Sequence, residues 1–299
     1  MAADCKSESE LENTTAMEGK TVLITGANSG IGKAAARALA KMGARVVISG
    51  RDRPALETAL ADIRSASGNN RVEMLVADLS SQKEVRRLAA EFKQTFGRLD
   101  VLLNNAGVIL SRRTVTVDGL ETTFAVNHLA PFLLTAFLRD ALVASAPARV
   151  VTVASEAHRQ TAGLDFDDLQ HEHRYFANSV YSQSKLANIL FTRALARRLA
   201  GTGVTANCLH PGVVATGWGA GGDVTGPFDW AMRLARPFMM SPEKGARTSV
   251  YLASSPDVAD VTGQYFAKCK PKQTSPAGCD DDAAERLWAV SAKLVNSEQ

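Results

Sequence analysis

The stretch TVLITGANSGIGKAAARAL, residues 21–39, joins a short apolar run to a helical pattern through a glycine-rich turn. Its glycines, Gly26, Gly30 and Gly32, follow the spacing G-x-x-x-G-x-G. Glycine lets the backbone turn sharply and lets a pyrophosphate approach, and the N-terminus of the following helix offers unpaired N–H donors. The alternative interpretation is a tight strand-to-helix connection without a ligand. The surrounding fold decides between the two.

Short apolar runs alternate with longer stretches of helical spacing after this turn. The runs lie at 21–25, 44–49, 71–77, 100–104, 148–154, 204–209 and 263–267, and the helical stretches at 31–42, 54–65, 82–96, 118–144, 180–199 and 241–253. Nearly continuous apolar strands that alternate with helices are typical of a parallel sheet covered on both faces. Because crossovers are right-handed, we predict an α/β fold: a single-domain doubly wound (Rossmann) parallel sheet of about seven strands with helices on both faces.

Three segments lie outside this alternation. Residues 1–18 are acidic and polar, so we expect a disordered tail before a single domain over residues 19–299. Residues 217–240 begin glycine-rich and end apolar and aromatic. Because a loop of this length is usually functional, we expect a substrate cap there. The acidic stretch CDDDAAE precedes a final helical pattern.

The composition argues against several classes of protein. Hydrophobic residues make up 45% and charged residues 22% of the 299 residues, which are globular values. The net charge of +3 is small and the basic residues form no stripe, so we expect no nucleic-acid partner. The sequence has no run of ~20 apolar residues and no signal-peptide pattern, so we expect a soluble cytoplasmic protein without a transmembrane segment.

Neither the cysteines nor the histidines indicate a metal site or a disulfide. The cysteines are Cys5, Cys208, Cys269 and Cys279. They show no C-x-x-C spacing, so reduced thiols fit better than disulfides or a zinc site. The stretch HEH at 171–173 lacks a third ligand, so we interpret it as a loop and predict no metal.

Placed after the first strand of a doubly wound sheet, the glycine turn favours dinucleotide binding. At the end of the second strand an acid binds the ribose 2′-OH of NAD, whereas an arginine accommodates the 2′-phosphate of NADP. The sequence ISGRD puts Gly50 at the expected strand end, followed by Arg51 and Asp52. We favour NADP(H) through Arg51. NAD(H) through Asp52 is the alternative, because a shift of one residue in the strand end exchanges the two roles.

Polar groups also follow the third and fourth strands, where ligands bind in open α/β sheets. Asp78 either bonds the adenine amino group or is an N-terminal acid of the helical stretch 82–96. The stretch NNAG at 104–107 can tie neighbouring strand ends together and let the cofactor lie close.

Seven motifs occur in one order along the chain: TGANSGIG (25–32), ADL (77–79), NNAG (104–107), VNH (126–128), VVTVAS (150–155), YSQSK (181–185) and HPGVVAT (210–216). Together they resemble the short-chain dehydrogenase/reductase superfamily over about residues 19–268. SEAHR and YSQSKLANILFTRALARRL are most similar to its retinol dehydrogenase-like branch. The resemblance implies an NAD(P)-dependent oxidoreductase that acts on CH–OH donors.

The resemblance further implies a set of site residues. The catalytic residues would be Asn127, Ser155, Tyr181 and Lys185. The cofactor would contact Gly26, Asn28, Ser29, Gly30, Ile31, Gly32, Arg51, Asp78, Leu79, Asn105, Ala106, Gly107, Tyr181, Lys185, Pro211, Gly212, Val214 and Thr216. His158, close to Ser155, either lines the substrate site or is a surface histidine.

Tyr181 precedes Lys185 by four residues, so the two side chains share one helix face. A phenol with a pKa near ~10 is a poor acid–base group at neutral pH. A cation about 4 Å away, at an effective dielectric near 20, contributes about 4 kcal/mol, or roughly three pKa units. We therefore expect Lys185 to lower the pKa of Tyr181 toward neutrality.

These features predict hydride transfer between NADP(H) and a carbonyl or alcohol. The apolar side chains of 217–240 suggest a lipophilic aldehyde, ketone or alcohol as the small-molecule substrate. The alternative is a non-catalytic NADP(H)-sensing binding protein, although such a protein does not need the Ser–Tyr–Lys set. Relatives suggest a homodimer or homotetramer through the helices near 118–144 and 179–200.

Overall fold

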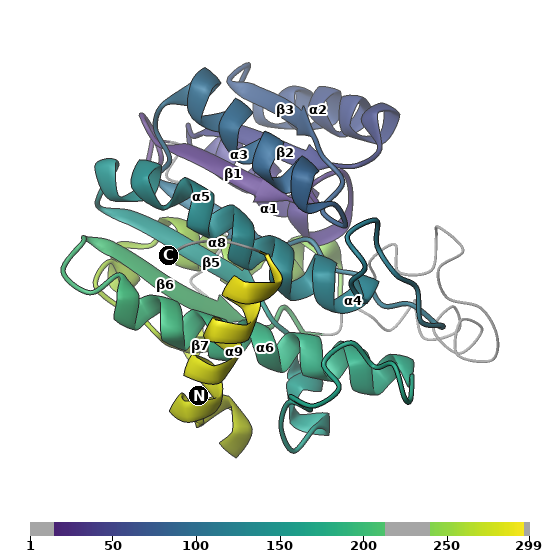
Figure 1. Ribbon diagram of the computed structural model, residues 1–299. Coiled ribbons are helices and arrows are strands. Elements are labelled where there is room, and N and C mark those ends of the chain that lie inside the picture. The colour runs from purple at the N-terminus through teal and green to yellow at the C-terminus, as the bar shows by residue number, and fades with distance from the viewer. Residues whose placement is uncertain (1–14, 213–239, 296–299) are drawn as a thin grey trace.

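The computed structural model describes residues 15–212 and 240–295. Its described part contains an eight-stranded sheet in the order β3-β2-β1-β4-β5-β6-β7-β8 (Figure 1). The strands are β1 (Thr21–Thr25), β2 (Arg45–Gly50), β3 (Val72–Val76), β4 (Val101–Asn104), β5 (Ala148–Val153), β6 (Val204–Leu209), β7 (Tyr265–Ala267) and β8 (Lys270–Pro271). All neighbours pair in parallel except β7 and β8. The predicted doubly wound fold is confirmed. The structure adds a short antiparallel eighth strand, which is too short at two residues to be predicted from the sequence.

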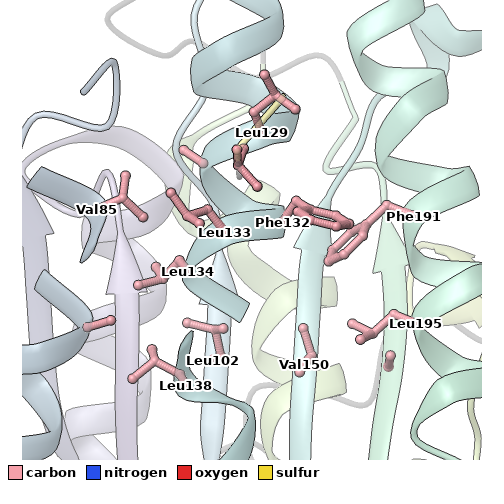
Figure 2. Packing of buried hydrophobic residues seen from close by; sticks show 14 of the residues in the cluster. Val85, Leu102, Leu129, Phe132, Leu133, Leu134, Leu138, Val150, Phe191 and Leu195 are labelled. Carbon is pink, nitrogen blue, oxygen red and sulfur yellow. The ribbon is translucent and has the colours of Figure 1, made fainter. Parts of the chain in front are cut away.

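Helices cover both faces of this sheet. They are α1 (Gly30–Lys41), α2 (Arg53–Ser67), α3 (Gln82–Phe96), α4 (Thr122–Phe124), α5 (Ala130–Ala144), α6 (Ala177–Arg198), α8 (Pro242–Ser254) and α9 (Asp281–Leu294). One buried cluster joins α3, α5, α6 and α9 to the sheet, and a second joins α1, α2 and α8 to the other face. Figure 2 shows the first cluster, where the Phe132 and Phe191 rings of α5 and α6 lie 5.8 Å apart between their centroids.

The stretch predicted as one helix over 118–144 is divided. Gly119 has a φ of +77°, in the left-handed region that favours glycine. A right-handed helix cannot continue through this conformation. The buried Glu121 then caps a new helix by accepting from the N–H groups of Thr123 and Phe124 at 2.8 and 2.6 Å. A π-helical turn, η2 (Ala125–Leu129), follows and leads directly into α5. Such turns are frequent at functional sites.

The described chain begins to pack before residue 19. Met17 is only 4% exposed, and its N–H donates to the Met42 carbonyl at 2.9 Å. Residues 1–14 of the expected tail lie outside the described residues.

One cysteine corrects the expectation of reduced thiols. Cys269 is disulfide-bonded, whereas Cys208 and Cys279 are free. Pairing depends on how close two Cβ atoms come in the fold, so sequence spacing did not reveal it. Within 15–212 and 240–295 no helix is long and apolar enough to cross a bilayer.

Candidate active site

The glycine turn connects β1 to α1 without room for side chains. Gly26 has a φ of +64°, and a Cβ there would lie 2.8 Å from the Cα of Ala106. A Cβ on Gly32 would lie 2.4 Å from the Asn105 amide nitrogen and 2.5 Å from the Gly26 carbonyl oxygen. Ser29 precedes α1 and makes no side-chain capping bond. The N-terminus of α1 therefore offers N–H donors, and the glycines let a ligand approach the backbone of the turn closely.

The end of β2 places Arg51 and Asp52 in different roles. Gly50 is the last residue of the strand, as expected, and a Cβ there would lie 3.4 Å from the Asn28 side-chain oxygen of the glycine turn. The Asp52 carboxylate caps α2 by accepting from the Ala55 N–H at 3.1 Å. Asp52 therefore serves the helix, while the exposed Arg51 lies directly beside the strand end.

The third and fourth strand ends complete this edge of the sheet. The Asp78 carboxylate accepts from the N–H and hydroxyl of Ser80 at 2.9 and 2.8 Å. Helix α3 is capped by Ser81, so the interpretation of Asp78 as the cap is not needed. Leu79 packs against the cluster of α3 and α5. Asp78 remains at the carboxyl end of β3, on the side of the glycine turn.

The stretch NNAG ties β4 to β1 as the sequence predicted. The Thr25 hydroxyl accepts from the N–H groups of Asn105 and Ala106 at 3.0 and 3.1 Å. The Asn105 amide donates back to the Thr25 carbonyl at 2.8 Å. Asn104, in contrast, points to the core, where its amide lies 3.2 Å from the Thr135 hydroxyl.

Tyr181, Lys185 and Ser155 come together at the carboxyl end of β5. The Tyr181 hydroxyl hydrogen-bonds to the Ser155 side chain. The Lys185 ammonium donates to the Val153 carbonyl at 3.0 Å and lies 5.6 Å from the centre of the Tyr181 ring. Tyr181 is 7% and Lys185 3% exposed, so both polar groups are shielded from bulk water.

Asn127 joins the same site from the π-helical turn. It is fully buried and donates to the Val108 carbonyl and to the Ser184 hydroxyl, both at 2.9 Å. A Cβ on Gly107 would lie 3.1 Å from the Lys185 nitrogen and 3.3 Å from the Asn127 oxygen. The structure thus brings together Asn127, Lys185 and Gly107, which are far apart in the sequence.

The protonation of the Tyr–Lys pair differs from the expectation. Burial raises the pKa of Tyr181, although its hydrogen bond with Ser155 opposes the shift. Burial lowers the pKa of Lys185 to about 8. The prediction that Lys185 lowers the pKa of Tyr181 is wrong for this arrangement. The ammonium bonds the Val153 carbonyl, and desolvation penalises both charged forms.

The last part of the predicted site follows β6. Pro211 and Gly212 lie at the strand end, and Gly212 has a φ of +87°. A Cβ on Gly212 would meet the Met240 methyl at 2.1 Å. Val214, Thr216 and the cap expected at 217–240 lie outside the described residues, except for Met240.

A cluster behind Ser155 was not anticipated. His158 is fully buried, so the interpretation as a surface histidine is wrong. It lies beside Glu156, His210 and Tyr265, and the last two were not singled out as functional residues. In the sequence, SEAHR indicates only the branch of the family, and nothing pairs it with strands β6 and β7.

The region around His171 forms a loop, with His171 at a φ of +50°. Among the described residues, no group of three or more His, Cys, Asp or Glu side chains could hold a metal ion.

The fold and this set of polar groups define a nucleotide-dependent oxidoreductase of the doubly wound type. The profile of the short chain dehydrogenase family matches residues 20–221, and the chain belongs to that family. It is therefore an NAD(P)-dependent oxidoreductase that acts on CH–OH donors.

Several relatives are similar over most of the chain. Retinol dehydrogenase 14 of Mus musculus is 45% identical over 93% of this chain and 86% of its own length. Retinol dehydrogenase 13 of Homo sapiens is 45% identical over 94% and 86%. These place the chain in the retinol dehydrogenase-like branch, as the motifs implied.

Solved structures share the fold. A crystal structure of an uncharacterised protein from Mycobacterium paratuberculosis matches with a TM-score of 0.74 and 33% identity, covering 94% of this chain and 95% of that one. An NADP active-site complex of RhlG from Pseudomonas aeruginosa matches with a TM-score of 0.67 and 29% identity, covering 85% and 96%.

Proposed function

We propose that the protein is an NADP(H)-dependent carbonyl reductase or alcohol dehydrogenase for lipophilic aldehydes, ketones or alcohols. One observation carries the proposal: the Tyr181 hydroxyl meets the Ser155 hydroxyl beside the buried Lys185 ammonium, next to the glycine turn. The alternative, a protein that only senses NADP(H), is not favoured because it has no use for this set.

The residues present fit a dinucleotide. Gly26 and Gly32 leave the turn without side chains, and Gly107 leaves space against the Lys185 nitrogen. The pyrophosphate would lie over Asn28, Ser29, Gly30, Ile31 and Gly32, at the N-terminus of α1. Asp78, Leu79, Ala106, Pro211 and Gly212 would line the remaining path. When bound, the nicotinamide supplies or accepts the hydride.

The chain's own residues would hold the substrate and move the proton. Ser155 would donate a hydrogen bond to the substrate oxygen, and Tyr181 would deliver the proton that the reduced carbonyl requires. Because burial raises the pKa of Tyr181, its phenol stays protonated at neutral pH, which suits carbonyl reduction. Asn127 would position a water for proton relay from Lys185.

The geometry of the β2 end supports NADP(H) over NAD(H). Asp52 is engaged as the cap of α2, which removes the acid that would bind the ribose 2′-OH. Arg51 follows Gly50 immediately and would meet the 2′-phosphate with a charge-assisted pair of hydrogen bonds. The NADP complex of RhlG is consistent with this preference.

The substrate class rests on the relatives and on the sequence of the cap. Two relatives that are 45% identical carry the name retinol dehydrogenase, and retinol is a long apolar alcohol. We therefore propose a lipophilic substrate, in keeping with the apolar and aromatic residues of the sequence 217–240.

A kinetic assay with Tyr181→Phe tests the function. The purified wild type should reduce retinal or a long-chain aldehyde with NADPH and prefer NADPH to NADH. Tyr181→Phe should lose about 10²–10⁴-fold in kcat, because general acid catalysis contributes that much, yet bind NADPH nearly as well. NADPH affinity from cofactor fluorescence is the control. Unchanged kcat in this variant contradicts the assignment.

Assembly and location are further proposals. Relatives suggest a homodimer or homotetramer through α5 and α6. However, α9 packs on both helices, so a second chain there would contact α9 as well. A cytoplasmic location stays a prediction.

A further inference from the structure

His158 occupies a sealed position directly behind Ser155. It lies in the short 3₁₀ turn η3 (Glu156–Gln160), of which Ser155 is the N-cap. Its Nδ1 is 2.6 Å from the Ser155 carbonyl oxygen, and its Nε2 is 3.2 Å from the Ser275 backbone nitrogen. The ring is fully buried and packs edge-on against Tyr265, with 5.1 Å between the ring centres.

These two partners determine the tautomer of His158. A carbonyl oxygen only accepts, so Nδ1 must carry the hydrogen that bonds Ser155. A backbone N–H only donates, so Nε2 must be the unprotonated nitrogen that accepts from Ser275. Protonation of the ring would place a second donor against the Ser275 N–H. The geometry therefore requires a neutral imidazole.

The contact with Ser155 bears on the proposed active site. The Ser155 carbonyl also accepts from the His158 N–H at 3.2 Å, so two donors hold this peptide group. The Ser155 hydroxyl accepts from the Ala157 N–H at 3.2 Å and meets the Tyr181 hydroxyl. A displacement of the Ser155 peptide group would therefore move the hydroxyl relative to Tyr181.

The groups around His158 favour the uncharged ring. Facing it are Glu156 and Arg159 of the same turn, Tyr265 of β7, His210 at the end of β6, and Lys272. The Glu156 carboxylate is already paired with Lys272 at 3.0 Å and with Arg159 at 2.8 Å. Burial is the main cause that lowers the pKa of His158, and the Arg159 and Lys272 charges act in the same direction, whereas the Ser155 hydrogen bond and the Glu156 charge oppose the shift.

We propose that His158 is a positioning residue: its Nδ1–H fixes the Ser155 peptide group, and its unprotonated Nε2 anchors the ring to the C-terminal segment at Ser275. The proposal rests on the proposed function, in which Ser155 holds the substrate oxygen. It assigns the histidine of the SEAHR motif a role that acts through Ser155, without direct contact with the reacting atoms.

Two amide variants separate the contacts of His158. In His158→Asn the side-chain nitrogen can replace Nδ1 and donate to the Ser155 carbonyl, whereas in His158→Gln the longer side chain reaches Ser275 instead. We expect His158→Asn to keep kcat within about threefold and His158→Gln to lose about tenfold, the effect of one hydrogen bond. The KM for NADPH should stay unchanged in both. A purely structural role would lower Tm in both variants without this difference in kcat.

The tautomer of His158 provides an independent readout. In ¹⁵N-histidine NMR of the wild type, His158 should show hydrogen on Nδ1. A hydrogen on Nε2, or a kcat in His158→Gln equal to that of the wild type, overturns the proposal. The NMR readout needs no turnover, so a wild type inactive on every carbonyl refutes the proposed function separately.

Discussion

At the scale of single residues, the buried Tyr181–Lys185 pair determines how this site can handle a proton. Both side chains are less than 10% exposed, and burial disfavours the charged form of each. The phenol is therefore held protonated, while the ammonium titrates within reach of physiological pH. Burial, and not only the four-residue spacing on one helix face, therefore determines the pKa values of this Tyr and Lys.

The lowered pKa of Lys185 predicts an alkaline limit to carbonyl reduction. Lys185 carries its proton below a pKa of about 8 and loses it above. Since the proton relay needs that proton, kcat should fall by about tenfold per pH unit above this value. A pH profile of kcat measures this alkaline limb, the fall of kcat above the pKa of Lys185. Lys185→Arg, which stays charged, should have lower activity but no such limb, and a limb that persists in it contradicts the assignment.

Arg51 determines cofactor preference if the 2′-phosphate lies at the end of β2. Arg51→Ala should raise the KM for NADPH by about 10–100-fold, the effect of a lost charge-assisted contact, and leave the KM for NADH unchanged. Arg53→Ala is the matched control, because its guanidinium pairs with Glu57 at 3.8 Å. Equal effects on both cofactors, or in both variants, would argue against NADP recognition by Arg51.

At the scale of elements, the site forms where the ends of β1, β4 and β5 meet the π-helical turn η2. The Thr25 hydroxyl joins β1 to the Asn105 and Ala106 backbone, and Asn127 reaches Val108 from η2. Parallel strands present their carboxyl ends at one edge, so residues from distant stretches gather there. The wide turn of η2 places Asn127 against this edge, which a regular helix over 118–144 did not suggest.

The close approach of the glycine turn to β4 can be tested with one methyl group. Gly32→Ala would put a Cβ 2.5 Å from the Gly26 carbonyl oxygen, a backbone atom that cannot move cheaply. Overpacking of this kind costs about 1–3 kcal/mol, so Tm should fall and NADPH affinity should drop by about tenfold or more. Thermal unfolding and cofactor titration measure the two effects.

Gly163→Ala is the matched control for this change. A Cβ there would have no atom within 4 Å, and Gly163 does not have a positive φ. It should leave Tm and NADPH binding unchanged. If Gly32→Ala behaves like Gly163→Ala, the turn does not approach the cofactor as closely as proposed.

At the scale of the whole molecule, helix α9 closes the face formed by α5 and α6. The Trp288 ring packs 4.8 Å from Phe132 and 5.9 Å from Phe191, measured between centroids. The Ser291 hydroxyl lies 2.8 Å from the buried His128 ring, which is adjacent to Asn127 in the chain. The C-terminal helix thus belongs to the core that supports the site.

Removing an apolar contact of α9 should destabilise the entire domain. Leu287 is 1% exposed, so Leu287→Ala should lower the free energy of unfolding by about 2–5 kcal/mol. Lys293→Ala, on the exposed side of the same helix, should change it by less than about 0.5 kcal/mol. Denaturant unfolding followed by circular dichroism compares the two. Equal stability of the variants would mean that α9 is dispensable for the core.

The sequence alone determined the doubly wound sheet and the helix positions except within 118–144, and it predicted candidate site residues at the strand ends. Local signals carry this information, since the strands are continuous apolar runs and the glycines at 26 and 32 occur where a strand becomes a helix. Asp52 as a cap follows from such a local pattern once the strand end is known, whereas the link between Thr25 and Asn105 joins residues 80 apart in the sequence.

Only the tertiary structure decided the electrostatics and the support of the site. The pKa shifts of Tyr181 and Lys185 depend on burial by segments distant in sequence, which spacing on one helix does not report. His158 binds Ser275, more than a hundred residues further along the chain, and α9 covers α5 and α6. Desolvation and long-range contacts arise from packing, so they are absent from any short stretch of sequence.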